Sequence, residues 1–252
     1  MKRTIILMAV AGLLATGCDK GDGGPARQIT ATRGVLPAVI VKKGPPIDGT
    51  LKSAIWLKCP PLVLGQCQSE EIGELKATAR VLFDPTHLYV AWECLQADTA
   101  GMKAEATERD DDVWNDDSAE IFISGDPRVG TFHFAVNSRG VLQDWKIDPY
   151  GEQDLTWNST AVVKSSIETN KGWIVTMSVP LKELGAYVGE NQTWPMNLNR
   201  TKPLAASGWT ESSWSAAGRS KYGDATGWGK ITGVRIPRRA DGVTRTAEAP
   251  KQ

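Results

Sequence analysis

Short alternations of apolar and polar residues, separated by turn residues, run along most of this 252-residue chain. Residues 77–83 alternate in this way, Asp84-Pro85-Thr86 follows as a turn, and residues 87–97 continue the pattern. Alternation with a period of two, bounded by turn residues, is typical of β-hairpins. The same reasoning predicts further strands over residues 38–41, 118–123, 131–137, 141–146, 159–168, 172–179, 194–200, 211–215 and 229–236.

This succession of short strands predicts an all-β fold, an antiparallel β-sandwich of the immunoglobulin or jelly-roll kind. Helical character is limited to brief turns at residues 51–56 and 180–184. A single domain over residues 36–236 accommodates all of the predicted strands. Residues 237–252 carry few large apolar side chains, so we expect a disordered tail there.

The N-terminus has the pattern of an export signal. Lys2 and Arg3 precede an apolar stretch, residues 4–14, that is too short to span a bilayer as a helix. The segment Leu14-Ala15-Thr16-Gly17-Cys18 follows and resembles a bacterial lipobox. An ordinary signal peptide with a chance cysteine is the alternative interpretation.

The lipobox interpretation divides the N-terminal region into two parts. Residues 1–17 are expected to be a lipoprotein signal peptide, and Cys18 is expected to carry fatty-acyl (palmitate) chains that anchor the protein to a membrane. Residues 18–35, rich in Gly, Asp and small residues, are expected to be a flexible tether. The predicted location is therefore the cell envelope, in the periplasm or at the cell surface.

The stretch RDDDVWNDDSAEIFIS, residues 109–124, combines an acidic loop with a strand. Ala119, Ile121 and Ile123 fall on one face of the strand, with Glu120 and Phe122 on the other. The loop is too acidic for a packed core, because unpaired buried carboxylates are costly. Trp114 in its middle is therefore expected to be exposed, an arrangement that suits a polar ligand with a flat apolar face, such as a sugar ring.

The aspartates of this loop allow three interpretations. They form a solvated acidic loop, or a calcium site in which Asp111, Asp112 and Asp116 supply hard oxygen ligands, or the carboxylate pair of a glycosidase. The third is disfavoured, because neighbours such as Asp116 and Asp117 point to opposite faces of an extended segment and cannot face one glycosidic bond. We therefore predict a protein that is not an enzyme.

Composition adds two constraints. The formal net charge is zero, so no nucleic-acid footprint is present. Ten tryptophans against four phenylalanines fit a binding surface, because tryptophan combines apolar area with a polar group. Several of these tryptophans must nevertheless be core residues, and we assign to the core Trp56, Trp92, Trp173, Trp214 and Trp228.

Three cysteines remain beyond Cys18. Cys59 and Cys67 bracket a short loop that a disulfide could close in an oxidising, exported compartment. Cys94 lies within a strand pattern and is expected to be a small buried apolar residue. With only two histidines in the chain, no zinc-site spacing is present.

Several segments, taken in order, resemble the family 9 carbohydrate-binding modules, which belong to a DOMON-like group. They cover almost the whole predicted domain and are Ile47-Asp48-Gly49 with Trp56, Val81 to Asp84 with Leu88-Tyr89-Val90, Val113 to Ile123, Phe134 to Asn137, Gly172 to Val175, Ser213-Trp214-Ser215, Tyr222-Gly223-Asp224, and Trp228-Gly229. The resemblance implies a β-sandwich with bound calcium that holds an oligosaccharide or polysaccharide between two aromatic rings.

The resemblance also suggests site residues. Trp114 and Tyr222 match the two rings, Glu120 and Asn137 match polar residues that contact the sugar, and His133 stands where a further polar contact is expected. Ala135 departs from the pattern, which has an arginine there. A glycoside hydrolase is a candidate neighbour for such a module.

Two alternatives stay open. The first is a haem-binding sandwich of the related DOMON-like group, for which His133, Met177 and Met196 are the plausible axial ligands. The second is a structural protein of the envelope that has no ligand.

Overall fold

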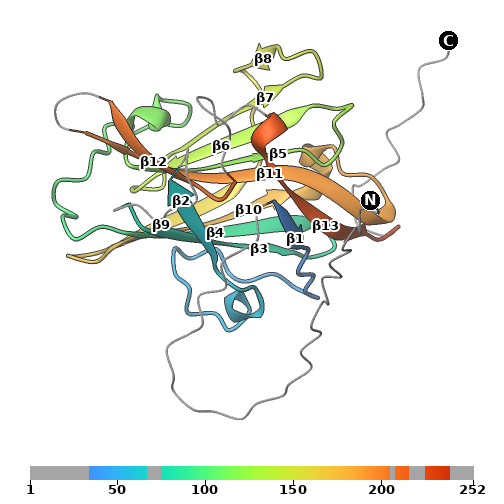
Figure 1. Cartoon of the computed structure of the whole chain (residues 1–252), viewed down its shortest axis with the longest axis horizontal. Coiled ribbons are helices and arrows are strands. Elements are labelled where there is room, and N and C mark those ends of the chain that lie inside the picture. The colour runs from blue at the N-terminus through green and yellow to red at the C-terminus, as the bar shows by residue number, and fades with distance from the viewer. Residues whose placement is uncertain (1–33, 67–74, 205–207, 216–224, 239–252) are drawn as a thin grey trace, which may run out of the picture.

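The computed structural model describes residues 34–66, 75–204, 208–215 and 225–238. The predicted leader (1–17), nearly all of the tether (18–35) and most of the tail (237–252) lie outside these residues, as do Cys18, Cys67 and Tyr222. The described part contains strands and short 3-10 helices, with no α-helix, which confirms the predicted all-β class (Figure 1). No helix within it is long and apolar enough to cross a membrane.

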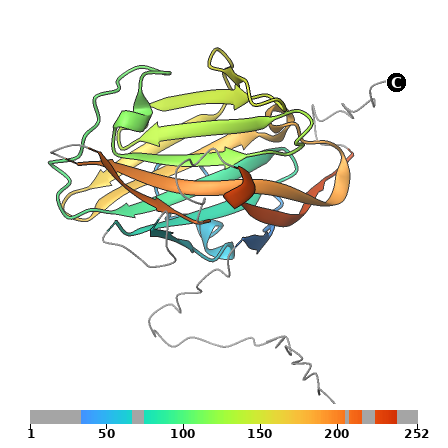
Figure 2. The same cartoon turned by 45° about the horizontal axis from the view of Figure 1, so that its top comes forward.

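Two layers of strands face each other (Figure 2). In the first layer the strands follow the order β8 (Gln153–Asp154), β7 (Leu142–Ile147), β6 (Thr131–Asn137), β5 (Ser118–Ile123), β11 (Gly189–Pro203) and β12 (Trp209–Ser213). The first half of β11 also pairs with β13 (Gly229–Ile236), which in turn pairs in parallel with β1 (Val35–Pro37).

The second layer has the order β2 (Leu62–Gln66), β3 (Ala77–Phe83), β4 (His87–Leu95), β10 (Gly172–Pro180) and β9 (Val162–Glu168). β12 pairs with β2, so the strand order continues from one layer into the other. Apart from β1 with β13, the paired strands are antiparallel. The fold is therefore a single antiparallel β-sandwich, as the alternating pattern predicts.

The core lies between the layers and is built from the inward positions of both. Alternate residues of β5 and β6, such as Ile121 and Phe134, meet inward residues of β4 and β10, such as Trp92 and Trp173. The five tryptophans assigned to the core are all buried. Two of them pack outside the main cluster: Trp56 belongs to a second cluster with Leu82 and Tyr89, and the ring centroid of Trp228 lies 5.4 Å from that of Phe122.

Strand boundaries follow the predictions closely where alternation is strong, and depart from them elsewhere. The predicted strand at 38–41 is wrong in its limits, since β1 is Val35–Pro37 and Ile40 forms only an isolated bridge with Phe83. The expected helical turn at 51–56 is found a few residues later as η1 (Trp56–Lys58). The remaining 3-10 helices are η2 (Val113–Asn115), η3 (Leu181–Leu184) and η4 (Ala225–Gly227).

The segment between Cys59 and Cys67, which a disulfide is predicted to close, contains β2. Cys59 is buried, and the backbone N–H of Val81 lies 3.4 Å from its Sγ atom. Burial raises the pKa of this thiol. Because Cys67 lies outside the described residues, the pairing with Cys59 stays a prediction. Cys94 is a buried free thiol in the core, as expected.

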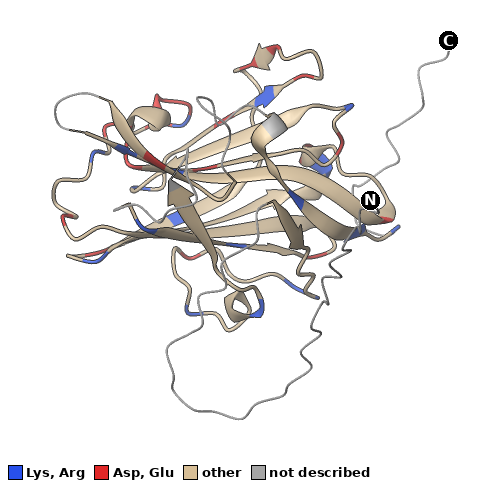
Figure 3. Cartoon of the chain, in the orientation of Figure 1, with Lys and Arg blue, Asp and Glu red and all other residues tan. Residues whose placement is uncertain are grey.

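Charged residues are distributed over both layers, with Lys and Arg interspersed among Asp and Glu (Figure 3). This distribution matches the zero formal net charge of the chain.

Candidate functional site

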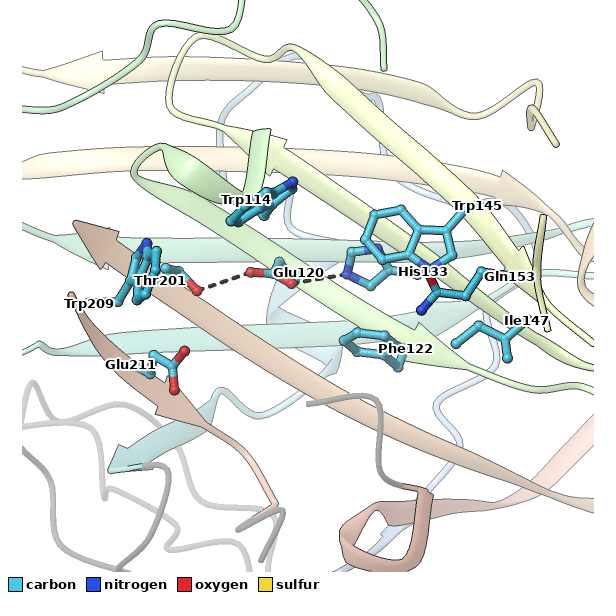
Figure 4. A pocket seen from close by; sticks show the side chains of 10 residues that line it. All are labelled: Trp114, Glu120, Phe122, His133, Trp145, Ile147, Gln153, Thr201, Trp209 and Glu211. Carbon is cyan, nitrogen blue, oxygen red and sulfur yellow. Dashed lines mark hydrogen bonds and ion pairs between the residues drawn. The ribbon is translucent and has the colours of Figure 1, made fainter. Parts of the chain in front are cut away.

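A groove of about 400 Å³ lies on the outer face of the first layer, and its size falls within the range of small-ligand sites. It is lined by residues of β5, β6, β7, β8, β11 and β12 together with one residue of η2 (Figure 4). The lining residues are Trp114, Glu120, Phe122, His133, Trp145, Ile147, Gln153, Thr201, Trp209 and Glu211.

The alternation of β5 positions the central floor residues. Ala119, Ile121 and Ile123 join the core, so Glu120 and Phe122 necessarily face outward into the groove. The neighbouring strand β6 alternates in the same way, with Phe132 and Phe134 in the core and His133 in the groove. The predicted outward orientation of Glu120 is therefore found in the structure.

A row of rings crosses the floor of the groove. Phe122, His133 and Trp145 are register partners on three adjacent strands. The ring centroid of His133 lies 4.1 Å from that of Phe122 and 3.7 Å from that of Trp145. The rings are tilted by 39° and 38° to one another, and such cross-strand ring contacts stabilise a sheet and give the groove a largely apolar floor.

Glu120 is the acidic group in this floor. Its Oε2 atom lies 3.0 Å from Nε2 of His133, and its Oε1 atom accepts a hydrogen bond of 3.0 Å from the Thr201 hydroxyl. The Ser118 hydroxyl lies 3.4 Å from the same Oε1 atom. The carboxylate is thus fixed in one orientation by residues on three adjacent strands.

His133 is fully buried, and this burial lowers its pKa below the ordinary value of 6.5, although the Glu120 carboxylate opposes the effect. The imidazole is therefore neutral at pH 7, with Nε2–H donated to Glu120 and Nδ1 left as an acceptor. Nδ1 has no hydrogen-bond partner among the described residues. His133 thus lies in the groove, as the resemblance implies, but beneath its aromatic neighbours.

Two exposed tryptophans line the Glu120 end of the groove (Figure 4). Trp114 on η2 is 42% exposed, as predicted for the ring in the acidic loop, and Trp209 on β12 is 50% exposed. The second ring suggested by the resemblance, Tyr222, lies outside the described residues. Sequence reasoning missed Trp209, although Trp209 and Glu211 alternate on one face of β12 and could have been found by their period of two.

Asn137 does not line the groove, so the predicted sugar contact is wrong for this structure. Its side chain is fully buried and donates to the carbonyl of Ala106 and to Asp116, at 3.1 and 3.0 Å. Its side-chain oxygen Oδ1 accepts the backbone N–H groups of Arg139 and Val141. Asn137 is buried because the loop before η2 folds over this end of β6. The side chain forms hydrogen bonds to polar groups of that loop.

The acidic loop is held by its own aspartates, which do not converge on a metal. Asp116 is buried and accepts backbone N–H groups of Glu105 and Ala106, and Asp111 accepts those of Thr107 and Glu108. These backbone donors lower the pKa of Asp111. Asp112 is exposed.

No group of three or more His, Cys, Asp or Glu side chains within the described ranges is gathered closely enough to hold a metal ion. The predicted trio of Asp111, Asp112 and Asp116 does not fit a calcium site, because two of these carboxylates already serve the loop backbone. Calcium binding by this protein stays a prediction.

An ion pair ties the same loop to the sheet. Nη2 of Arg109 lies 2.6 and 2.8 Å from the two carboxylate oxygens of Asp144, which is buried on β7. Asp144 also accepts the backbone N–H of Ser159. Burial raises the pKa of Asp144, while Ser159 and Arg109 oppose that change.

The residues suggested for a haem site are not brought together. Met177 and Met196 are buried in the core between the layers, whereas His133 projects from the opposite face of its sheet. An iron atom in the groove would therefore have no second ligand from this set. Ala135 is also buried, in a small cluster with Ala106 and Val113.

A β-sandwich with a preformed groove of aromatic rings and hydrogen-bonding groups on its outer face defines a small-ligand binding module. The chain matches the family model described as carbohydrate family 9 binding domain-like over residues 47–234, and it belongs to this family. Family 9 modules bind carbohydrates and are not catalytic, so the chain is a carbohydrate-binding module and not an enzyme. A comparison with curated proteins finds no match.

Solved structures with the same fold share little sequence with this chain. A protein of Bacteroides uniformis, proposed to bind carbohydrate, has 15% identity and a TM-score of 0.64, covering 80% of this chain and 99% of its own. A family 9 module from Caldicellulosiruptor kristjanssonii in complex with cellotriose has 16% identity and a TM-score of 0.56, covering 86% and 98%. The same organism's family 9 module in complex with glucose has 14% identity and a TM-score of 0.57, covering 82% and 99%.

Proposed function

We propose that the groove binds a saccharide, with Trp114 and Trp209 as the rings that contact the apolar faces of the sugar. The observation that carries the proposal is that both exposed tryptophans line the same groove as Glu120 and Thr201. Sugar rings have flat apolar faces and hydroxyl groups at their edges, so they need this combination of rings and polar atoms. In this proposal Trp209 is the second ring, and the contact suggested for Tyr222 stays a prediction.

The expected affinity is modest. Covering about 100 Å² of apolar surface on each ring, at about 25 cal/mol/Å², contributes on the order of 2.5 kcal/mol per ring. Two rings and a few hydrogen bonds, less the cost of association, leave a dissociation constant roughly in the millimolar to micromolar range. The cellotriose and glucose complexes of the Caldicellulosiruptor kristjanssonii module support gluco-configured sugars as the first ligands to test.

A glycan array tests the proposal, with calcium added in one set and a chelator in the other. The wild-type protein should retain one class of oligosaccharide, and a Trp114→Ala/Trp209→Ala double variant should retain none. Retention of the same glycans by the double variant would show that the ligand binds elsewhere. A difference between the two sets would reveal the predicted calcium dependence.

We further propose that the module acts at the cell envelope, anchored through a lipid on Cys18. The support is the sequence of residues 1–18, with its positive start, apolar stretch and lipobox-like end. Mass spectrometry of the mature N-terminus from membranes should find acylated Cys18, and Cys18→Ser should move the protein to the soluble fraction. At a membrane surface, such a module would hold oligosaccharides close to a glycoside hydrolase neighbour.

A further inference from the structure

We propose that the groove selects a saccharide that carries a protonated amine, such as a glucosamine unit, over neutral and acidic sugars. The inference rests on the proposed function, because it names the class of sugar that the same site takes. It is carried by the charge balance of Glu120 and by the aromatic walls of the groove.

Glu120 is a buried acidic group, and no Lys or Arg lines the groove beside it among the described residues. Only 4% of its surface is exposed, and its hydrogen-bond partners are Ser118, His133 and Thr201. Two of these are hydroxyl donors, and burial keeps the third, an imidazole, neutral at pH 7. Buried carboxylates are normally balanced by a cation, because an unpaired charge is expensive to remove from water. A cation supplied by the ligand would complete the site.

His133 does not supply the missing positive charge. Its neutral ring directs Nε2–H to Glu120, and its Nδ1 atom is buried. The Glu120 carboxylate is therefore left as the charged acceptor of the floor. An ammonium group brings three N–H donors and no acceptor, so it matches this floor better than a hydroxyl, a carboxylate or an acetamide.

The aromatic walls favour the same ligand. Trp114, Trp145 and Trp209 line the groove, and the faces of tryptophan rings attract cations. None of the described residues that line the groove is Lys or Arg, whereas Glu211 adds a second carboxylate. The inference depends on Glu120 alone, because Glu211 has an interaction of its own.

Calorimetric titration with three matched trisaccharides tests the inference. β-1,4-linked trimers of glucose, N-acetylglucosamine and glucosamine differ only at carbon 2, which bears a hydroxyl, an acetamide or an amine. At about pH 6, where an aliphatic amine is protonated, the glucosamine trimer should bind at least about ten-fold more tightly than the glucose trimer. A trimer of galacturonic acid should bind most weakly. Equal affinities for the glucose and glucosamine trimers would overturn the inference.

Two further arms identify the source of the preference. Glu120→Gln keeps the size of the side chain and removes its charge, so the ratio of the two affinities should fall close to one. Glu168→Gln is the matched control, because Glu168 is an exposed residue of β9 in the other layer, and there the ratio should be unchanged. A ratio that persists in Glu120→Gln would contradict the inference.

The wild-type protein provides a test that no folding defect can obscure. At about pH 9.5 the amine of the ligand is neutral, and the preference for the glucosamine trimer should disappear. A preference that remains there would not be one for charge. Failure of all four trisaccharides to bind would overturn the proposed function as well, whereas binding without discrimination would overturn only the amine preference.

Discussion

Trp114 lies at the rim of the groove on a single turn of 3-10 helix, η2, whose Val113 is buried while the indole is 42% exposed. A side chain in this position contributes mainly to the free energy of ligand binding and little to the stability of the core. We predict that Trp114→Ala weakens sugar binding about thirty-fold, the effect of about 2 kcal/mol of lost apolar contact. The melting temperature should change by less than about 2 °C.

Calorimetry with the best glycan, together with thermal unfolding, measures both quantities. Tyr150→Ala is a suitable control, because Tyr150 is a highly exposed aromatic residue that does not line the groove. The control should bind like the wild type. A large loss of stability in Trp114→Ala with unchanged affinity would assign Trp114 to packing and remove it from the site.

His133 should make the stability of the domain depend on pH. Its pKa is lowered in the folded protein, so below the ordinary value of 6.5 the unfolded chain takes up a proton that the folded protein does not. The stability that the neutral ring supports is therefore present above pH 6.5 and is lost as the pH falls below it. His133→Gln keeps a donor for Glu120 but cannot titrate.

Denaturant unfolding between about pH 7.5 and pH 5 measures this effect. The difference in unfolding free energy between the wild type and His133→Gln should shrink as the pH is lowered through this window. Changes at the aspartates are common to both proteins and cancel in the difference. A difference that stays constant with pH would show that the folded protein binds the proton as readily as the unfolded chain.

At the scale of the element, the loop that carries Trp114 is held by interactions of side chains with backbone and by one ion pair to β7. Arg109 meets Asp144 with one guanidinium nitrogen between both carboxylate oxygens. We predict that Arg109→Gln lowers stability by about 1–3 kcal/mol, because it leaves a buried carboxylate with fewer donors. Sugar affinity should also fall several-fold, since Trp114 depends on this loop for its position.

The double variant Arg109→Gln/Asp144→Asn separates the two contributions. Removal of both charges should restore part of the stability in denaturant unfolding, because no unpaired carboxylate is left in the sheet. Additive losses in the double-mutant cycle would instead show that the two residues act independently.

Strands with strong alternation and clear turns could be predicted from the sequence almost to the residue, as β5, β6 and β13 show. β2 could not, because its residues 62–66 show a continuous apolar start and no alternation, and its pairing with β12 is set by long-range contacts. The same limit applies to the site. Glu120 and Trp114 follow from local pattern, whereas the burial of Asn137 depends on a loop that folds over it from thirty residues earlier in the chain.

For the whole molecule, Arg200 is the residue that connects the two layers at one end. It is fully buried on β11, and its Nη1 atom donates to the carbonyls of Lys76 and Leu95, at 2.8 and 2.9 Å. Nη2 donates to Gln96 at 2.7 Å. The guanidinium also lies over the ring of Trp173. These contacts join the long strand beneath the groove to the opposite sheet.

We predict that Arg200→Met lowers the free energy of unfolding by about 3–5 kcal/mol, because it removes the buried hydrogen bonds of the guanidinium to Lys76, Leu95 and Gln96. Arg200→Lys should restore little, since an ammonium group cannot reproduce the planar fork. At low temperature, where the variant is folded, its sugar affinity should stay within about three-fold of that of the wild type. Arg200 does not line the groove, whereas its neighbour Thr201 faces the groove from the opposite side of the sheet. Denaturant unfolding and calorimetry measure the two effects, and loss of binding without loss of stability would place Arg200 in the site instead of the core.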